Sequence, residues 1–425
     1  MKENLGYPMV TREEIERAYE TIHEHIVDTP IIISATLSDL CGCTTLFKLE
    51  NLQVTGAFKE RGALNKLMNL TDAEKTRGVV AASAGNHAQG VACHAKRLGI
   101  PATIVMPRGT PLVKITSTQH WDAQVILEGD SYDDSYAFAQ KLATEEGATY
   151  IHAFADPLVI AGQGTIGIEI LRHPLCGDLD AIVVPIGGGG LISGVAAYVK
   201  TLRPDVRIIG VETESCPAMK ETLDCGRALS LSPSEPACLA DGIMVRKVGD
   251  INVEMVRRYV DDIVTVNDDE IANAILLLLE IEKNVVEGAG AVPLAALLNR
   301  KISGLSAKKV LSILSGGNID VTLLSRIITR GLAFDGRLVQ FQIQLRDVPG
   351  ALESVLHLFH EANANILEIV HHHYTAGAPI GRINVTITLE TKSFGHIGEI
   401  QRNLDESGYL SYRNAPMADV ATPLE

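Results

Sequence analysis

The sequence predicts an α/β fold with a mostly parallel sheet, followed by a smaller unit of a different type. Between residues 79 and 320, short apolar runs alternate with amphipathic stretches, which is the pattern of parallel strands covered on both faces by helices. Beyond about residue 330, the order becomes strand, helix, strand, strand, helix and a final strand, as in a ferredoxin-like βαββαβ unit. Ligands bind at the carboxyl ends of parallel strands, so we expect the functional site there.

Apolar runs mark the strands of the larger unit. They are expected at residues 79–83, 102–107, 123–129, 181–186, 207–212, 262–266 and 309–317. The segments between them include NHAQGVACHAKRLG and SYDDSYAFAQKLATEEG, whose apolar residues recur with a helical period.

Composition excludes several classes of protein. The chain has 425 residues, 46% of them hydrophobic, which suffices for two or three domains. A formal charge of -15 argues against nucleic acid or an anionic membrane as a partner.

The start, MKENLGYPMVTREE, lacks the apolar core of a signal peptide, and no apolar run is long enough for a membrane span. Seven scattered cysteines do not resemble a disulfide framework. We expect a cytoplasmic protein without a metal site, because CGC at 41–43 lacks a second cysteine pair.

Lys59 is the first candidate for catalytic chemistry. It stands beside Phe58 in NLQVTGAFKERGALNKL, between Gly56 and Gly62, where an apolar run begins a helix. A lysine in such a place is ordinarily a solvated helix residue. A lysine held against apolar surface instead loses its proton readily and becomes a nucleophile toward a carbonyl cofactor. The local sequence leaves both interpretations open.

The glycine-rich stretch VVPIGGGGLISG predicts an anion site. A strand leads into four glycines, and a helix follows them, so exposed amides and the helix dipole favour a phosphate. A nucleoside-triphosphate loop is excluded because no Lys-Ser or Lys-Thr follows. A literal GxGxxG also occurs as GQGTIG at 162–167, but no clear strand precedes it, so a dinucleotide site is not expected there.

Two further strand ends carry polar residues. In ASAGNHAQG, Ser83, Asn86 and the first helical amides suit a carboxylate, although ordinary N-capping explains these residues equally well. His87 taken alone is more readily a structural residue. In LSGGN, Ser315 offers a neutral hydroxyl at a glycine-lined turn. The strand ends and Lys59 together supply an amine, a phosphate cradle, a carboxylate clamp and a hydroxyl, which a pyridoxal phosphate pocket requires.

The motifs TGAFKERGA, SAGNHAQG, GGGGL and LSGGN, in this order, resemble the threonine dehydratases (threonine ammonia-lyases) of the tryptophan synthase β family, or fold type II. The resemblance covers about residues 5–330 and implies two open, mostly parallel α/β sheets with pyridoxal 5'-phosphate as cofactor. It implies that Lys59 forms a Schiff base with the cofactor and that Phe58 lies against it. The other implied cofactor contacts are Asn86, Gly187, Gly188, Gly189, Gly190, Leu191 and Ser315. The implied substrate contacts are Ser83, Ala84, Gly85, Asn86 and His87, with Gly242 and Glu287 as further pocket residues.

The resemblance implies dehydration and deamination of L-threonine to 2-oxobutanoate and ammonia, with L-serine to pyruvate as a side activity. A neutral Ser315 at the pyridine nitrogen weakens the electron sink, which favours β-elimination over transamination. Alternatives of the same fold are an L-serine dehydratase and a serine racemase-like enzyme. Alternatives of other classes are an NAD-dependent dehydrogenase and an inactive amino-acid sensor.

Serine racemases differ from this chain at two places. They carry a serine where this chain has Ala84, and a second acidic metal ligand where it has Ala218 after Glu212. A methyl group cannot return a proton to the substrate, so we expect elimination to dominate, without dependence on a divalent metal.

The C-terminal motifs RDVPGAL and NANILEI resemble the ACT domain, a regulatory module that commonly binds amino acids. We expect a catalytic domain at 1–328 with a subdomain of about 50–150, a linker at 329–336, and this regulatory domain at 337–425. Isoleucine or valine is the expected effector, at a site formed by Asp347, Gly350, Asn365 and Ile366.

The regulatory domain is expected to pair with its copy, so the protein should be a homo-oligomer, either a dimer or a tetramer. In the run HHH, strand alternation places His371 and His373 on one face and His372 on the other. Exposed strand histidines are expected there rather than metal ligands.

Overall fold

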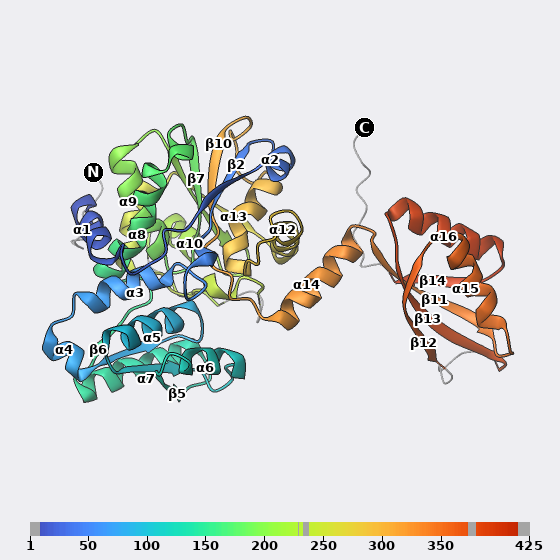
Figure 1. Cartoon of the computed structure of the whole chain (residues 1–425), viewed down its shortest axis with the longest axis horizontal. Coiled ribbons are helices and arrows are strands. Elements are labelled where there is room, and N and C mark those ends of the chain that lie inside the picture. Colours follow the sequence, from blue (N-terminus) through green and yellow to red (C-terminus); the bar gives the residue numbers. More distant parts are fainter. Residues whose placement is uncertain (1–8, 228, 233–237, 373–379, 415–425) are drawn as a thin grey trace. The chain divides into compact units, whose positions relative to one another are not determined.

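The computed structural model describes residues 9–227, 229–232, 238–372 and 380–414, and it divides into two compact units (Figure 1). The first unit is Met1–Ile319 and the second is Asp320–Glu425. Each unit has its own hydrophobic core. No helix of the described residues is long and apolar enough to cross a membrane.

The larger sheet of the first unit has six strands in the order β1-β2-β10-β7-β8-β9. All neighbours are parallel except β1 and β2, which pair antiparallel. The central strands are buried on both faces, as their continuous apolar sequences predict. Their bounds are β1 (Ile31–Ser34), β2 (Thr44–Lys48), β7 (Ala181–Pro185), β8 (Arg207–Thr213), β9 (Asp262–Val266) and β10 (Lys309–Ile313).

A second, smaller sheet has four parallel strands in the order β5-β4-β3-β6. The strands are β3 (Val79–Ala82), β4 (Ala102–Met106), β5 (Gln124–Leu127) and β6 (Thr149–Tyr150). All seven predicted strands are present, and they are divided between two sheets as the family resemblance implied. Sequence reasoning missed β1, β2 and β6, which are short or lie outside the alternating region.

The helices of the first unit cover the sheets and begin at well-formed caps. Thr11, Thr71, Ser131 and Asn267 each form a capping box with an acidic residue three positions later. The helices are α1 (Arg12–Ile22), α2 (Ala35–Cys41), α3 (Lys59–Met68), α4 (Asp72–Arg77), α5 (Asn86–Leu98), α6 (Leu112–Gln119), α7 (Tyr132–Glu146), α8 (Pro157–Arg172), α9 (Gly190–Leu202), α10 (Ala218–Cys225), α11 (Asp250–Tyr259), α12 (Asp268–Glu280) and α13 (Gly288–Leu298), with short 3-10 turns η1 (Glu50–Leu52), η2 (Pro174–Cys176) and η3 (Asp241–Ile243).

The GQGTIG motif lies entirely inside the buried helix α8, so it does not join a strand to a helix. A Cβ on Gly162 would lie 2.7 Å from the carbonyl oxygen of Arg61 in α3, and one on Gly164 would lie 3.0 Å from that of Gly194 in α9. The glycines therefore allow α8 to cross two neighbouring helices at close range. This arrangement removes the basis for the NAD-dependent dehydrogenase hypothesis.

The second unit is a four-stranded antiparallel sheet in the order β12-β13-β11-β14, which is the ferredoxin-like arrangement. Its strands are β11 (Leu338–Arg346), β12 (Asn365–His372), β13 (Arg382–Glu390) and β14 (Leu410–Asn414). The helices α15 (Ala351–Glu361) and α16 (Phe394–Glu406) pack together on one face of this sheet (Figure 1).

The other face of this sheet carries glutamine and threonine side chains at its centre, including Gln342 opposite Thr386. The unit begins with the helix α14 (Val321–Phe334), so residues 329–334, expected to start a linker, are helical. His371 and His372 lie on β12, whereas His373 is outside the described residues.

Candidate active site

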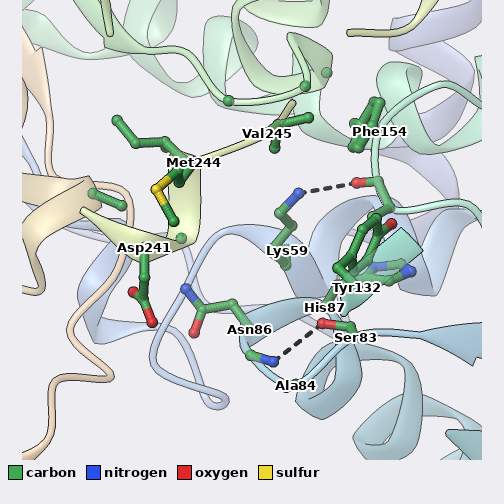
Figure 2. Close-up of a pocket in the computed structure, with 18 of the residues that line it drawn as sticks. Lys59, Ser83, Ala84, Asn86, His87, Tyr132, Phe154, Asp241, Met244 and Val245 are labelled. Atoms are coloured by element: carbon green, nitrogen blue, oxygen red, sulfur yellow. Dashed lines mark hydrogen bonds between the residues drawn. The ribbon is translucent and has the colours of Figure 1, made fainter. Parts of the chain in front are cut away.

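A cavity of about 340 Å³ lies where β3, β7 and β10 end, between the two sheets of the first unit. Lys59 lies between the segment that begins at Ser83 and the segment that contains Met244 and Val245 (Figure 2). Every site residue that the sequence predicted in the catalytic unit lines this cavity: Phe58, Lys59, Ser83, Ala84, Gly85, Asn86, His87, Gly187, Gly188, Gly189, Gly190, Leu191, Gly242, Glu287 and Ser315.

Lys59 is the first residue of α3, and its amine points into the cavity (Figure 2). The Nζ atom donates a hydrogen bond to the carbonyl oxygen of Ala153 at 2.9 Å and lies 5.2 Å from the centroid of the Phe58 ring. Burial lowers the pKa of Lys59 from 10.5 to about 8, although the charge of Glu287 opposes the change. The amine is therefore deprotonated more readily than one in water, as the nucleophile interpretation requires.

The four glycines connect β7 to α9, and Gly189 has a φ of 92°, which favours glycine. A Cβ on Gly188 would overlap the ring of Phe154, and one on Gly190 would lie 2.9 Å from the carbonyl oxygen of Phe154. Among the described residues, the amides of Gly187, Gly188 and Gly189 donate to no backbone acceptor. Packing behind the loop thus demands glycine, and the unused amides at a helix start suit an anion.

Two residues that sequence reasoning missed support this loop from behind. Asn252 of α11 is fully buried and donates from Nδ2 to the carbonyl oxygen of Phe154 at 3.2 Å and to Ser193 Oγ at 3.3 Å. Phe154 also packs edge-on against His152, with 4.7 Å between the ring centroids. The position of the glycine loop therefore depends on contacts between segments that are far apart in sequence.

Asn86 opens α5 and joins two distant segments of the cavity wall. Its Nδ2 donates to Glu287 Oε1 at 2.6 Å, and its Oδ1 accepts from Asn318 Nδ2 at 2.8 Å. Burial raises the pKa of Glu287 to about 7, with the neighbouring charge of Asp241 acting in the same direction. Glu287 is thus a carboxyl group that titrates near neutral pH beside Lys59.

The start of α5 has the features of a carboxylate-binding site. Ser83 Oγ accepts from the amide of Gly85 at 3.1 Å (Figure 2), and a Cβ on Gly85 would meet nothing within 4 Å. The ring of His87 makes a hydrogen bond with the carbonyl oxygen of Ile151 at 3.0 Å through Nε2. Burial lowers the pKa of His87 to about 3, so its ring is neutral. The space beside Gly85 at the start of α5 is therefore open, whereas His87 is a buried helix-start residue.

Ser315 follows β10 and is almost fully buried at the cavity wall. Its hydroxyl lies 3.5 Å from the carbonyl oxygen of Ala289, which is long for a hydrogen bond between these groups. The hydroxyl can therefore turn toward a better partner in the cavity.

Two ion pairs cross the mouth of the cavity, and neither was predicted. Lys114 of α6 pairs with Asp241 at 3.0 Å, and Asp133 of α7 pairs with Arg246 at 3.4 Å. Tyr132, at the start of α7, lines the same mouth. Both pairs are partly exposed and individually weak, so they can break when a ligand enters.

Glu212 is occupied by the local backbone. Its two carboxylate oxygens accept from the amides of Met219 at 2.8 Å and Lys220 at 2.9 Å, at the start of α10. Burial raises the pKa of Glu212 to about 7. Ala218 supplies no ligand, and no cluster of potential metal ligands occurs in the part of the chain that the structure describes.

The residues of the cavity fit pyridoxal phosphate on chemical grounds. A primary amine of lowered pKa suits the aldehyde, and unused amides at a helix start suit the phosphate. The glycine loop leaves no side chain to block the phosphate. The fold and this cavity define an α/β enzyme whose cavity suits a phosphate-bearing carbonyl cofactor.

Comparison with known proteins identifies the family. Residues 22–316 match the model of the pyridoxal-phosphate dependent enzymes, and the chain belongs to this family. It is 49% identical over 401 residues to an L-threonine ammonia-lyase of Thermotoga maritima, covering 94% of this chain and 98% of the relative. The structure of maize serine racemase superimposes with a TM-score of 0.71 at 34% identity, over 77% of this chain and 99% of that one. The processed form of threonine deaminase isoform 2 from Solanum lycopersicum gives 0.70 at 35% identity, over 77% and 98%.

The predicted effector residues are not all brought together. A hollow of about 550 Å³ in the second unit is lined by Asp347, Gly350 and His371, among others. Asn365 instead donates to Glu390 at 3.0 Å, at the opposite end of β13. Because β13 is nine residues long, its two ends lie roughly 27 Å apart at about 3.4 Å per residue. Asn365 and Ile366 therefore cannot complete this hollow within one chain.

Proposed function

We propose that this protein is an L-threonine ammonia-lyase, which converts L-threonine to 2-oxobutanoate and ammonia and accepts L-serine more poorly. One observation carries the proposal: an amine of lowered pKa, a glycine loop with unused amides and an open helix start line one cavity. The 49% identity to the Thermotoga maritima enzyme along nearly the whole chain supports the choice of substrate.

Lys59 has two tasks in this proposal. It would hold the cofactor covalently, and its free amine would accept the proton from the substrate Cα. The cofactor, when bound, supplies the electron sink that makes this proton acidic. Burial keeps the pKa of Lys59 near 8, so a useful fraction of the amine is unprotonated near neutral pH.

The start of α5 orients the substrate. We assign the substrate carboxylate to Ser83 and to the first amides of α5, where the helix dipole and the open space at Gly85 favour an anion. A carboxylate held there leaves Cα facing Lys59 across the cavity. We assign Asn86, Ser315 and the residues from Gly187 to Leu191 to the cofactor, because they line the same cavity as Lys59 and the family resemblance implies these contacts.

The choice between elimination and racemisation depends on Ala84. The likeness to maize serine racemase supports racemisation as the alternative reaction. Inversion requires an acid on the face of the substrate opposite Lys59. Ala84, which stands where serine racemases carry a serine, lines the cavity and has no proton to donate. Loss of the β-hydroxyl is therefore favoured over inversion.

A steady-state assay tests the proposed function directly. Purified protein supplied with pyridoxal phosphate should release 2-oxobutanoate from threonine and, more slowly, pyruvate from serine. Borohydride treatment should fix the cofactor to Lys59, which peptide mass spectrometry can locate. Comparable rates of D-serine formation and pyruvate release would favour the racemase instead. Absence of both reactions, with no fixation, would favour an inactive amino-acid sensor.

We further propose that residues 337–414 form an ACT-like regulatory domain that works as a pair. The strand β12 lies at an edge of its sheet and has no partner on its outer side among the described residues. Leu367, Ile369 and Val370 on this strand are exposed. An unpaired edge with apolar side chains favours pairing with a second copy. This edge strand thus carries exposed apolar side chains, of which Val370 lies opposite Thr386 on the glutamine-bearing face.

Pairing of two β12 strands would also complete the hollow. If residues 365–372 pair antiparallel with the same residues of a second copy, Asn365 of that copy lies opposite His372, and Ile366 lies opposite His371. His371 lines the hollow that contains Asp347 and Gly350. The proposed effector site, for isoleucine or valine, is therefore shared by two subunits.

A further inference from the structure

Four charged side chains form a fully buried cluster behind α3. Lys48 of β2 donates to Glu169 of α8 at 2.5 Å, and Arg61 of α3 donates to Glu169 at 2.6 Å and to Glu50 at 2.7 Å. All four side chains are at most 4% exposed. Two positive charges face two negative ones within the buried cluster, and the exposed Asp28 lies 3.4 Å from Lys48 at its edge. Its members come from four elements that are separated by up to 121 residues in sequence.

Arg61 uses its whole guanidinium group in this cluster. Nε and one terminal nitrogen donate to the two oxygens of Glu50, and both terminal nitrogens donate to Glu169, at distances of 2.6–2.8 Å. The remaining donor reaches Thr165 Oγ1 at 3.2 Å. Burial alone would lower the pKa of Arg61, but the two carboxylates raise it. Five directional donors fix the orientation of Arg61, and hence the helix that bears it.

Stability alone does not explain this cluster. Replacing a buried ion pair by apolar residues of similar volume is often neutral or stabilising, because the charges lose their hydration. A fully paired arginine instead provides geometric definition that an apolar contact lacks. The cluster lies beside the first turn of α3, so this turn is the part of the molecule whose geometry it fixes.

Arg61 lies two residues after Lys59, at the start of the same helix. Two residues correspond to roughly 200° around a helix, so the two side chains leave α3 on opposite sides. Between them, Glu60 is also held, because Thr55 donates to Glu60 Oε2 from both its amide and its hydroxyl at 2.7 Å. The reactive amine thus extends from a helical turn whose other charged side chains are anchored.

The helix α8 provides a fixed base for this anchor. Glu169 and Thr165 belong to α8, and the same helix meets α3 at a close crossing of Gly162 with the Arg61 backbone. The side-chain and backbone contacts between α3 and α8 therefore act on the same turn.

We propose that Arg61 is a positioning residue, which fixes the first turn of α3 through Glu50 and Glu169 and thereby holds the Lys59 amine at the cavity wall. The inference rests on the role proposed for Lys59. Loosening this turn would admit water to the amine and displace it from the reacting atoms.

The test compares two ion pairs between the same two helices. Arg61→Lys keeps the charge and loses the five-donor geometry, and Glu169→Gln removes one carboxylate. Lys66→Met is the matched control, because Lys66 of α3 pairs at 2.7 Å with Asp156, the residue that caps α8, about two turns from Lys59. In full-length protein without cofactor, acylation of Lys59 by acetic anhydride is followed against pH by mass spectrometry. With cofactor restored, kcat and KM for threonine are measured.

We expect Arg61→Lys and Glu169→Gln to raise the pH midpoint of Lys59 acylation by about one unit, because a better solvated ammonium holds its proton more tightly. A displacement of about 1 Å should lower kcat by about 10- to 100-fold, while KM changes little because the start of α5 is intact. Lys66→Met should leave the acylation midpoint and kcat at their wild-type values, even if it lowers the thermal midpoint.

Wild-type acylation and kcat in a folded Arg61→Lys protein would overturn the inference and leave the cluster a purely structural role. If Arg61→Lys does not fold, Thr165→Val decides the question, because it removes only one acceptor of Arg61. A smaller shift of the same sign would then support the inference, and no shift would overturn it. The acylation midpoint does not depend on turnover. A shifted midpoint in a protein that does not deaminate threonine would therefore reject the proposed substrate and retain the positioning role.

Discussion

The two hollows of this protein differ in how much of their wall one chain supplies. The cavity of the first unit is lined by residues between Phe58 and Asn318, and hydrogen bonds such as that from Asn86 to Glu287 join its distant segments. The hollow of the second unit is formed mainly by one continuous segment, residues 346–353, together with His371 and Ile383. Its other predicted residues lie at the far end of the domain. The chemistry is thus contained in one chain, whereas the proposed control requires two.

The most severe test of the self-contained cavity is Lys59→Ala. We expect turnover of threonine to fall to background, because the substitution removes both the covalent anchor and the base. Circular dichroism and thermal unfolding should show a folded protein, since the side chain makes one hydrogen bond, to Ala153. Deamination near the wild-type rate by purified Lys59→Ala would show that the cavity has been assigned wrongly.

Deleting residues 337–425 removes the hollow of the second unit and leaves the cavity of the first unit in place. The remaining chain keeps every residue that lines the cavity, so we expect it to bind the cofactor and deaminate threonine. Its response to isoleucine or valine should be lost, which corresponds to a coupling of about 1–3 kcal/mol, or 5- to 150-fold in affinity. Initial rates with and without each amino acid measure the effect. A response that survives the deletion would place the effector site in the first unit.

Mixing subunits of two different variants tests whether the effector site is shared between two copies of the chain. Asp347→Ala and Asn365→Ala should each abolish the effector response when present in every subunit, because each damages both sites of a pair. A pair that contains one of each variant has one intact site, since Asp347 and Asn365 of that site come from different copies. Random mixing makes about half of the pairs mixed, each with one of its two sites intact, so we expect about a quarter of the response to return. Mixtures that behave like either parent would exclude the antiparallel pairing of β12.

The smallest expected effect concerns the electrostatics of the cavity itself. The carboxylate of Glu287 raises the pKa of Lys59, opposing the larger effect of burial. Glu287 titrates at about 7 and is mostly ionised near pH 8, so Glu287→Gln removes a stabilising charge and should lower the pKa of Lys59 further below 8. The pH midpoint of Lys59 acylation should fall by up to about one unit. A rise in this pH midpoint would mean that Glu287 affects Lys59 through packing rather than through its charge.

The sequence predicted the cavity well because its residues cluster in short motifs at strand ends. Ser83, Gly187 and Ser315 follow buried strands, and parallel strands bring their carboxyl ends to one edge. The alternation of apolar and amphipathic stretches likewise predicted seven of the ten described strands of the first unit, and the element order predicted the ferredoxin-like unit. Such signals are local, so one chain segment is enough to detect each of them.

Features that depend on distant partners escaped prediction. Nothing near Arg61 shows that it meets Glu169, 108 residues away, and Phe154 follows a two-residue strand with no motif. Asn365 was grouped with Asp347 because both lie in motifs of the same small domain. The length of β13 separates them, and only the strand order made this visible.

The ion pairs at the cavity mouth make ligand traffic sensitive to the solvent. Lys114–Asp241 and Asp133–Arg246 carry side chains that are 33–64% exposed, so dissolved salt screens both of them. Higher ionic strength therefore favours an open mouth and faster exchange of ligand. The buried cluster around Arg61 is shielded from the same ions. Rates of entry and release should thus vary with salt, while the reactivity of Lys59 inside the cavity should not.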